Sequence, residues 1–136
     1  MNRRRFIQTT AAVPLAAAAG TAAASAAPDF RSVAQAVIEA WRGKDLEGML
    51  SHIDENIVWH SHVSSPPIVG KAAMREFAGK LTAQMNDIRW RIFDTAQNDD
   101  RLYLEGVDDF VTTEGRRVVL PYAGVLVFRG ALISEW

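Results

Sequence analysis

The sequence predicts an α+β fold in which three N-terminal helices pack on a curved, mostly antiparallel sheet and enclose an apolar pocket. Two observations predict it. Apolar residues recur at helical spacing in three segments before residue 86, and long segments with strand character follow from residue 88 onward. Helices followed by a run of strands are typical of an α+β domain, and 136 residues allow one such domain.

Composition excludes several classes of site. The chain has no cysteine, so a disulfide, a thiol nucleophile and a zinc site built on thiolates are impossible. The formal net charge is −1, which does not suggest a nucleic-acid partner. No Gly-rich phosphate loop follows residue 27, and we expect neither a cofactor nor a metal.

The first 26 residues have the features of a secretory signal of the twin-arginine type. Arginines at positions 3–5 precede a moderately apolar run, and Ala-Ser-Ala at 24–26 is a small-residue cleavage site. An uncleaved anchor or a disordered arm are alternatives, but Pro14 and Gly20 interrupt the run, which is short for a membrane span. We expect residues 27–136 to be a domain exported to the bacterial periplasm or secreted, without a stable membrane span after cleavage.

Three helices are expected near the start of this domain. The first spans residues 29–42, with Asp29 or Ser32 as its cap and Gly43 at its end. Asp45 caps a short second helix, and the third spans residues 70–82 or slightly beyond. Their apolar positions are expected in the core: Phe30, Val33, Ala34, Val37, Ile38, Trp41, Leu46, Met49, Leu50, Ile53, Met74, Phe77, Ala78, Leu81 and Met85.

Strand character is found in five segments. They are residues 57–63, 88–95, 101–112, 117–128 and 132–136, with a turn at 97–100 and a hairpin at Glu114-Gly115. Pro121 predicts a bulge or an edge, and Gly124 a bend. In the first strand His60 and His62 share a face. They are either two metal ligands or two exposed or hydrogen-bonded histidines, and no convincing third ligand accompanies them.

The central strand places an acid among apolar residues. One face holds Leu102, Leu104, Gly106, Asp108 and Phe110. The other, half-polar face holds Tyr103, Glu105, Val107 and Asp109, and is expected on the wet side. Burial on a concave apolar face raises the pKa of a carboxyl, so Asp108 is a candidate general acid or base. The alternative is a surface acid near the end of a strand.

Short motifs are spread over the whole predicted domain. They are Ala40-Trp41, Asp54-Glu55-Asn56-Ile57-Val58-Trp59, Ile68-Val69-Gly70-Lys71-Ala72-Ala73-Met74, Glu105-Gly106-Val107-Asp108-Asp109-Phe110, Leu120-Pro121-Tyr122-Ala123-Gly124-Val125 and Gly130-Ala131-Leu132-Ile133-Ser134-Glu135-Trp136. In these motifs the chain resembles the nuclear-transport-factor-2-like superfamily, whose fold is a cystatin-like, cone-shaped α+β barrel. Within it, the chain is most similar to the limonene-1,2-epoxide hydrolase family and its polyketide-cyclase relatives.

This resemblance implies roles for individual residues. In that hydrolase family a Tyr, an Asn and an Asp hold a water that opens an epoxide, a second Asp protonates the epoxide oxygen, and an Arg links the two acids. By resemblance Asp108 is the proton donor, and Trp59, Ser61 and Gly106 stand at the Tyr, Asn and Arg positions. The remaining Asp would lie beyond Trp136, so we expect the domain to lack its C-terminal end. The matching substrate-binding wall consists of Leu81, Met85, Phe110, Leu120 and Tyr122, with Gly106 beside them.

Three functions follow. The first is an enzyme acting on a small apolar substrate, either by epoxide hydrolysis or by a related isomerase-like or cyclase-like proton transfer, in which Asp108 is assisted by Ser61, His60 or Tyr122. The second is a secreted, non-catalytic module that binds a small apolar ligand. The third is a structural domain that pairs with itself. Because members of the superfamily commonly pair through the sheet, we expect a homodimer, with Trp90 or Phe93 exposed.

Overall fold

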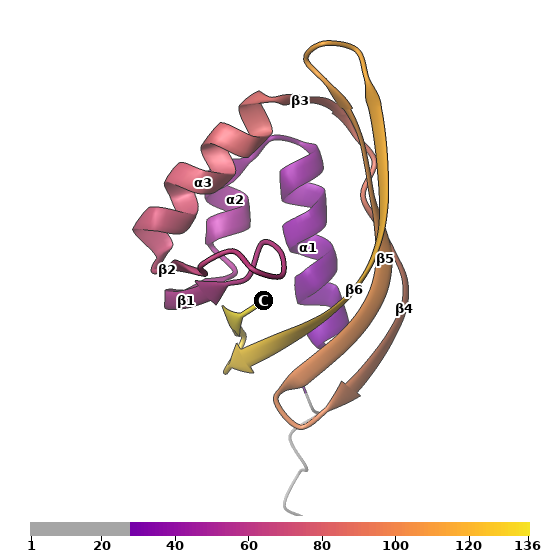
Figure 1. Ribbon diagram of the computed structural model, residues 1–136. Coiled ribbons are helices and arrows are strands. Elements are labelled where there is room, and N and C mark those ends of the chain that lie inside the picture. Colours follow the sequence, from indigo (N-terminus) through magenta and orange to yellow (C-terminus); the bar gives the residue numbers. More distant parts are fainter. Residues whose placement is uncertain (1–27) are drawn as a thin grey trace, which may run out of the picture.

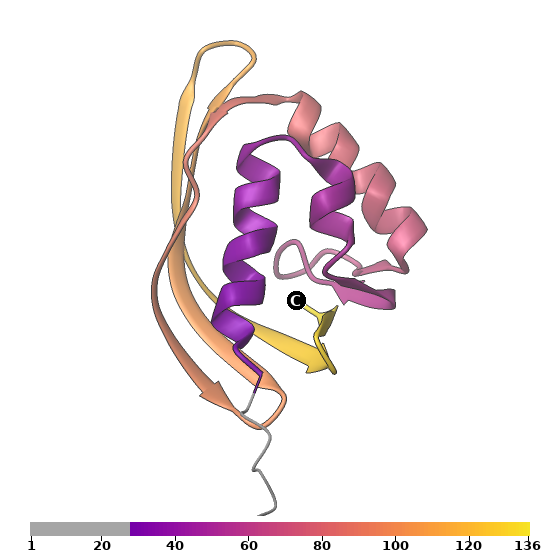
Figure 2. The same cartoon turned by 180° about the vertical axis from the view of Figure 1, so that it is seen from behind.

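The computed structural model describes residues 28–136, so the predicted signal over residues 1–26 lies outside the described part. A strongly curved sheet forms one side of the molecule, and three helices lie on its concave side (Figures 1 and 2). The helices precede most of the strands in the chain, as predicted. The α+β fold class is therefore confirmed, with a sheet that curves without closing into a barrel.

The helices begin where their caps were expected. Helix α1 (Phe30–Arg42) is capped by Asp29, whose side chain accepts a hydrogen bond from the Ser32 amide, and α2 (Leu46–Leu50) is capped in the same way by Asp45. Helix α3 (Lys71–Ala83) has Gly70 as its N-cap and no side-chain cap. Among residues 28–136, no helix is long and apolar enough to cross a membrane.

Seven strands form the sheet. They are β1 (Ile53–Trp59), β2 (Ile68–Val69), β3 (Met85–Ile88), β4 (Arg91–Asn98), β5 (Arg101–Thr112), β6 (Arg117–Arg129) and β7 (Leu132–Glu135). Their order is β2-β1-β7-β6-β5-β3, and β4 pairs with β5 beside β3. All pairs are antiparallel except β1 with β7, which are parallel. This parallel pair places β1, the first strand in the chain, beside β7, the last.

The first strand is shifted from its predicted position. It was expected over residues 57–63, but β1 spans Ile53–Trp59, so Ile53 lies in a strand and His60 and His62 lie after its end. A register shift between Ile53 and Val58 leaves two neighbouring residues, Glu55 and Asn56, exposed in succession. The alternation of faces that marks a strand in the sequence is broken there. The predicted shared strand face of the two histidines is therefore wrong.

The expected strand over residues 88–95 is two strands. Strand β3 ends at Ile88 and β4 begins at Arg91, and both pair with β5. Between them the Arg89 amide donates to the Asp109 carbonyl oxygen at 2.7 Å, and Trp90 is buried with 8% of its surface exposed. The prediction that Trp90 is exposed is wrong, whereas Phe93 is 58% exposed, as expected.

Strands β5 and β6 are the two longest strands of the curved sheet and pair with each other. Their register runs without interruption from Arg101 opposite Val127 to Val111 opposite Arg117. Pro121 therefore sits at no bulge. It lies instead on the part of β6 that β7 leaves uncovered, since β7 reaches only Val127 to Arg129.

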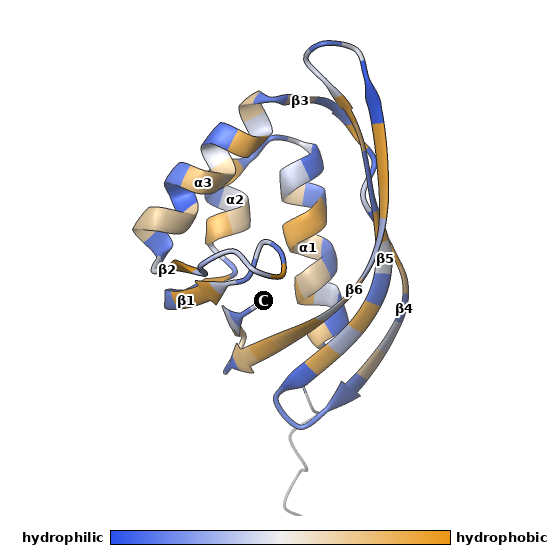
Figure 3. Ribbon diagram, in the orientation of Figure 1, coloured by the Kyte–Doolittle hydropathy of each residue, from blue (hydrophilic) through white to orange (hydrophobic). Residues whose placement is uncertain are grey.

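A single core lies between α1, the other helices and the concave sheet face. Apolar and polar residues alternate along much of β5 (Figure 3), and Leu102 and Leu104 of its concave face are buried in the core. The rings of Phe30 and Phe128 stack with their centroids 3.9 Å apart, which fixes the start of α1 against β6. The half-polar face of β5, which was expected to be exposed to solvent, is only partly exposed. Val107 and Asp109 are buried there, and Asp109 accepts two hydrogen bonds from the Arg117 guanidinium, at 3.0 and 2.7 Å.

Candidate functional site

A cavity of about 660 Å³ lies between the helices and the concave face of the sheet. Its walls come from α1, α3, the ends of β1 and β7, and the middle of β5 and β6. Apolar and aromatic side chains dominate the walls, and a few polar groups converge on the same space. This combination is typical of a small-molecule site.

Asp108 is the carboxyl on the concave face of β5. It lies opposite Leu120 of β6, follows Gly106 on the same face, and lines the cavity. Partial burial in these apolar surroundings raises its pKa from 3.8 to about 6. No hydrogen bond or ion pair to Asp108 is found among residues 28–136. The carboxyl is therefore free to interact with a molecule in the cavity.

Tyr122 is the polar neighbour of Asp108 in the cavity. It pairs with Gly106 across β5 and β6, and its phenol lies directly over that glycine. A Cβ at Gly106 would stand 2.9 Å from the phenol oxygen and 2.4 Å from the Arg91 carbonyl oxygen, closer than real contacts allow. Gly106 is therefore required for this close packing. Burial, and then the negative charge of Asp108, raise the pKa of Tyr122 to about 12, so its O–H stays a proton donor at neutral pH.

All four tryptophans of the chain line this cavity. Trp41 lies 4.7 Å from Trp90 and 5.8 Å from Trp59, measured between ring centroids, and Trp59 lies 4.7 Å from Trp136. The indole N–H groups of Trp41 and Trp90 are buried, and neither has a hydrogen-bond partner among the described residues. The tryptophans form a continuous aromatic wall.

The mouth of the cavity carries several polar side chains, and Arg101 of β5 also lines the cavity. His60, Ser61 and His62 follow β1 and line the cavity, and Glu135 of β7 faces the same space. The His60 Nε2 and Glu135 Oε1 atoms are 3.2 Å apart, and both side chains are about half exposed. Within residues 28–136, no group of three or more His, Asp or Glu side chains is arranged to hold a metal ion.

Most predicted site residues meet in this one cavity. Asp108, Trp59, Ser61, Leu81, Met85, Phe110, Leu120 and Tyr122 all line it. Gly106 does not, because the phenol of Tyr122 covers it. Leu120 lies on the uncovered part of β6 and is 54% exposed.

Sequence reasoning missed three tryptophans of the wall and Glu135. The sequence predicts Trp41 in the core, Trp90 at the surface and Trp136 at the end of the last strand, and it predicts no role for Glu135. The local sequence holds no signal for the pair that Glu135 makes with His60. It depends on the parallel pairing of β1 with β7, which joins residues 75 positions apart.

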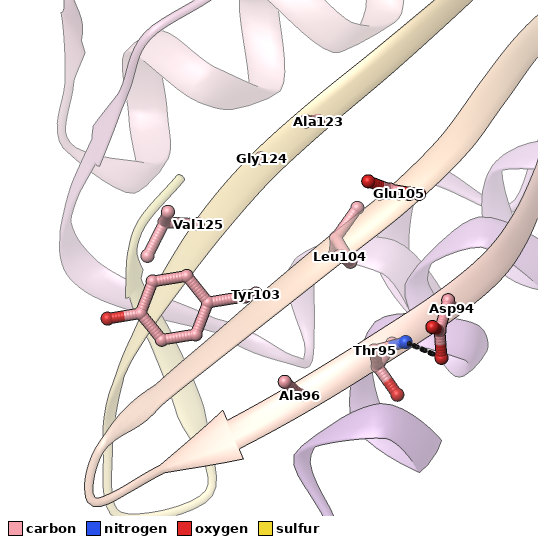
Figure 4. A pocket seen from close by; sticks show the side chains of 9 residues that line it. All are labelled: Asp94, Thr95, Ala96, Tyr103, Leu104, Glu105, Ala123, Gly124 and Val125. Atoms are coloured by element: carbon pink, nitrogen blue, oxygen red, sulfur yellow. Dashed lines mark hydrogen bonds between the residues drawn. The ribbon is translucent and has the colours of Figure 1, made fainter.

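A second, shallower hollow of about 500 Å³ lies over β4, β5 and β6 on the outer face of the sheet (Figure 4). Tyr103 and Val125 lie next to each other there, and the carboxylates belong to Asp94 and Glu105 (Figure 4). Both acids are exposed to solvent. We therefore place the candidate site in the concave cavity, which holds the half-buried acid.

An open curved sheet, three helices on its concave side and a deep apolar cavity with one half-buried carboxyl define an α+β small-molecule-binding domain. The chain belongs to the SnoaL-like domain family, whose sequence pattern matches residues 34–136. Comparison with curated proteins gives no match.

Solved structures share the fold at low sequence identity. An NTF2-like protein of unknown function from Burkholderia pseudomallei K96243 is 16% identical, with a TM-score of 0.69 over 80% of this chain and 88% of that one. An LEH-like epoxide hydrolase from M. tuberculosis is 15% identical, with a TM-score of 0.69 over 79% and 78%. A polyketide cyclase proposed for Xanthomonas campestris pv. campestris is 23% identical, with a TM-score of 0.66 over 78% and 85%. The predicted membership of the nuclear-transport-factor-2-like superfamily is confirmed.

Proposed function

We propose that this chain is an enzyme that moves a proton to or from a small, largely apolar substrate, with Asp108 as its acid–base group. The observation that carries the proposal is the position of this carboxyl. It lies on the concave wall of an apolar cavity with a pKa of about 6, beside the phenol of Tyr122. A general base works best when its pKa is close to the pH at which it acts.

The favoured reaction is a proton transfer next to a carbonyl group. The Asp108 carboxylate takes a proton from the carbon beside the carbonyl, so that the C–H bond breaks and negative charge builds on the carbonyl oxygen. The Tyr122 phenol donates a hydrogen bond to that oxygen and stabilises the charge. The protonated Asp108 then returns the proton to another carbon, which completes an isomerisation.

The second candidate reaction is hydrolysis of a small epoxide. It is favoured by the same pKa, because Asp108 stays protonated up to about pH 6 and can give its proton to the epoxide oxygen. Solved relatives with this fold include the LEH-like epoxide hydrolase. Trp59 and Gly106 stand where the limonene-1,2-epoxide hydrolase family has a Tyr and an Arg. A water molecule would therefore need another side chain to hold it.

The pH dependence separates the two reactions. Proton abstraction needs the ionised carboxyl, so its rate should rise as the pH passes about 6. Epoxide opening needs the protonated carboxyl, so its rate should fall over the same interval. A pH–rate profile therefore identifies which form of Asp108 acts.

The test is isomerisation of a β,γ-unsaturated cyclic ketone, followed by ultraviolet absorbance as the double bond becomes conjugated. We expect Asp108→Asn to lower the rate by about 10²-fold or more. Asp94→Asn is the matched control, because Asp94 is an exposed acid of the outer face, and its rate should equal that of the wild type. Full activity in Asp108→Asn would refute the proposal. A probe that raises the melting temperature of the wild type without being converted would favour the non-catalytic binding module instead.

A further inference from the structure

His60 and Glu135 form a polar pair on the wall of the cavity. The imidazole Nε2 and the carboxylate Oε1 are 3.2 Å apart, within hydrogen-bond distance. Both side chains line the same cavity as Asp108 and are about half exposed. Water from outside therefore reaches this pair, whereas apolar walls surround Asp108.

The backbone around the pair is fixed. The His60 amide donates to the Trp136 carbonyl oxygen at 2.7 Å, and the Trp136 amide donates to the Val58 carbonyl oxygen at 3.0 Å. These bonds continue the parallel pairing of β1 with β7, in which Val58 lies opposite Glu135. The two side chains thus come from neighbouring, hydrogen-bonded segments, so their contact does not depend on a free loop.

The contact has a chemical consequence for the imidazole. A neutral histidine carries one N–H, and a carboxylate at Nε2 favours the tautomer with the proton on that nitrogen. The other ring nitrogen, Nδ1, then has a lone pair and accepts a proton. No hydrogen bond to Nδ1 of His60 is found within residues 28–136.

We infer that His60 is a second catalytic residue of this cavity, which activates a water molecule at the mouth, and that Glu135 is its positioning residue. This inference rests on the proposed function in its hydrolytic form. The substrate class is a small apolar molecule whose strained cyclic ether lies between His60 and Asp108, both of which line the cavity.

The step is balanced between the two groups. His60 Nδ1 takes a proton from water while the water oxygen forms a bond to one carbon of the ring. The bond from that carbon to the ether oxygen breaks, and the protonated Asp108 gives its proton to this oxygen. The product is a vicinal diol, and solvent exchange returns the proton from the imidazolium to Asp108.

The experiment uses the full chain with styrene oxide in water enriched in ¹⁸O, and measures the labelled diol by mass spectrometry. We expect diol formation by the wild type and a loss of about 10²-fold or more in kcat for His60→Ala. Added imidazole should restore activity to His60→Ala in a saturable way. Glu135→Gln should lower kcat with little change in KM. His52→Ala is the matched control, because His52 lies outside the cavity, and it should keep the activity of the wild type.

Three results would each overturn the inference: no diol from the wild type, full activity in His60→Ala, and a loss of activity in that variant that imidazole does not restore. The ketone assay keeps the two proposals apart. If the wild type isomerises the ketone through Asp108 but forms no diol, only the inference fails. If Asp108→Asn retains both reactions, the proposed function fails together with the acid step of the inference.

Discussion

Replacing Asp108 by Asn should make the protein more stable at high pH. The folded-state pKa of Asp108 is about 6, above its ordinary value of 3.8, so the folded state holds this proton more tightly than the unfolded state. The resulting stabilisation is complete below the unfolded pKa and is lost as the pH rises through 6. Above that pH the wild type keeps a carboxylate in an unfavourable apolar place, and the neutral amide removes this cost.

The magnitude follows from the shift in pKa. A difference of about two pKa units corresponds to roughly 3 kcal/mol at about 1.4 kcal/mol per unit. Because Asp108 is only partly enclosed, solvent screening lowers the effect to about 1–2 kcal/mol. For a domain of about 100 residues, this raises the melting temperature by roughly 5–10 °C.

Urea and thermal unfolding of the wild type and Asp108→Asn at pH 4.5 and pH 8 measure this effect. The gain in stability of the variant should be roughly two- to threefold larger at pH 8 than at pH 4.5, and Asp94→Asn should show no comparable difference between the two pH values. An Asp108→Asn protein with no added stability at pH 8 relative to pH 4.5 would contradict the placement of this carboxyl in an apolar cavity. The measurement needs no substrate, so it tests the site independently of the reaction.

Three further predictions concern other parts of the molecule. Gly106→Ala should lower the free energy of unfolding by about 1–3 kcal/mol through overpacking. Gly124→Ala is the control and should cost little stability, because its Cβ would meet no atom closer than 3.8 Å. Urea unfolding of the two variants compares these effects. Tyr103, 42% exposed on the outer sheet face, should lie in the interface of a homodimer, so sedimentation velocity should show a monomer for Tyr103→Glu and a dimer for the wild type. Export should leave a chain that begins at residue 27, and N-terminal sequencing of periplasmic protein in a twin-arginine-competent bacterium would show an uncut terminus if the signal prediction is wrong.

The parts of the fold that depend on local physics were predictable from the sequence. Asp29 and Asp45 cap helices because their side chains accept hydrogen bonds from free amides three residues on, and this needs no tertiary information. The alternation of apolar residues along β5 placed Asp108 on the concave face for the same reason.

The parts that depend on long-range pairing were not predictable. The alternation of Ile88, Trp90 and Ile92 reads as one strand, although the chain crosses from β3 to β4 at Trp90, because the break is imposed by pairing with β5. Likewise, an amphipathic stripe does not distinguish a residue that faces a core from one that faces a cavity. Trp41 satisfies both descriptions, since it is buried and also lines the cavity.

The aromatic wall gives the protein a built-in optical reporter. Because all four tryptophans of the chain border one cavity, the whole of its indole fluorescence arises there. With ring centroids 4.7 to 5.8 Å apart, excitation passes readily from one indole to the next. A ligand that quenches one ring therefore lowers the fluorescence of all four tryptophans. Unlabelled wild-type protein can be titrated with candidate substrates in a fluorimeter, and the change in intensity or wavelength reports occupancy of the cavity directly.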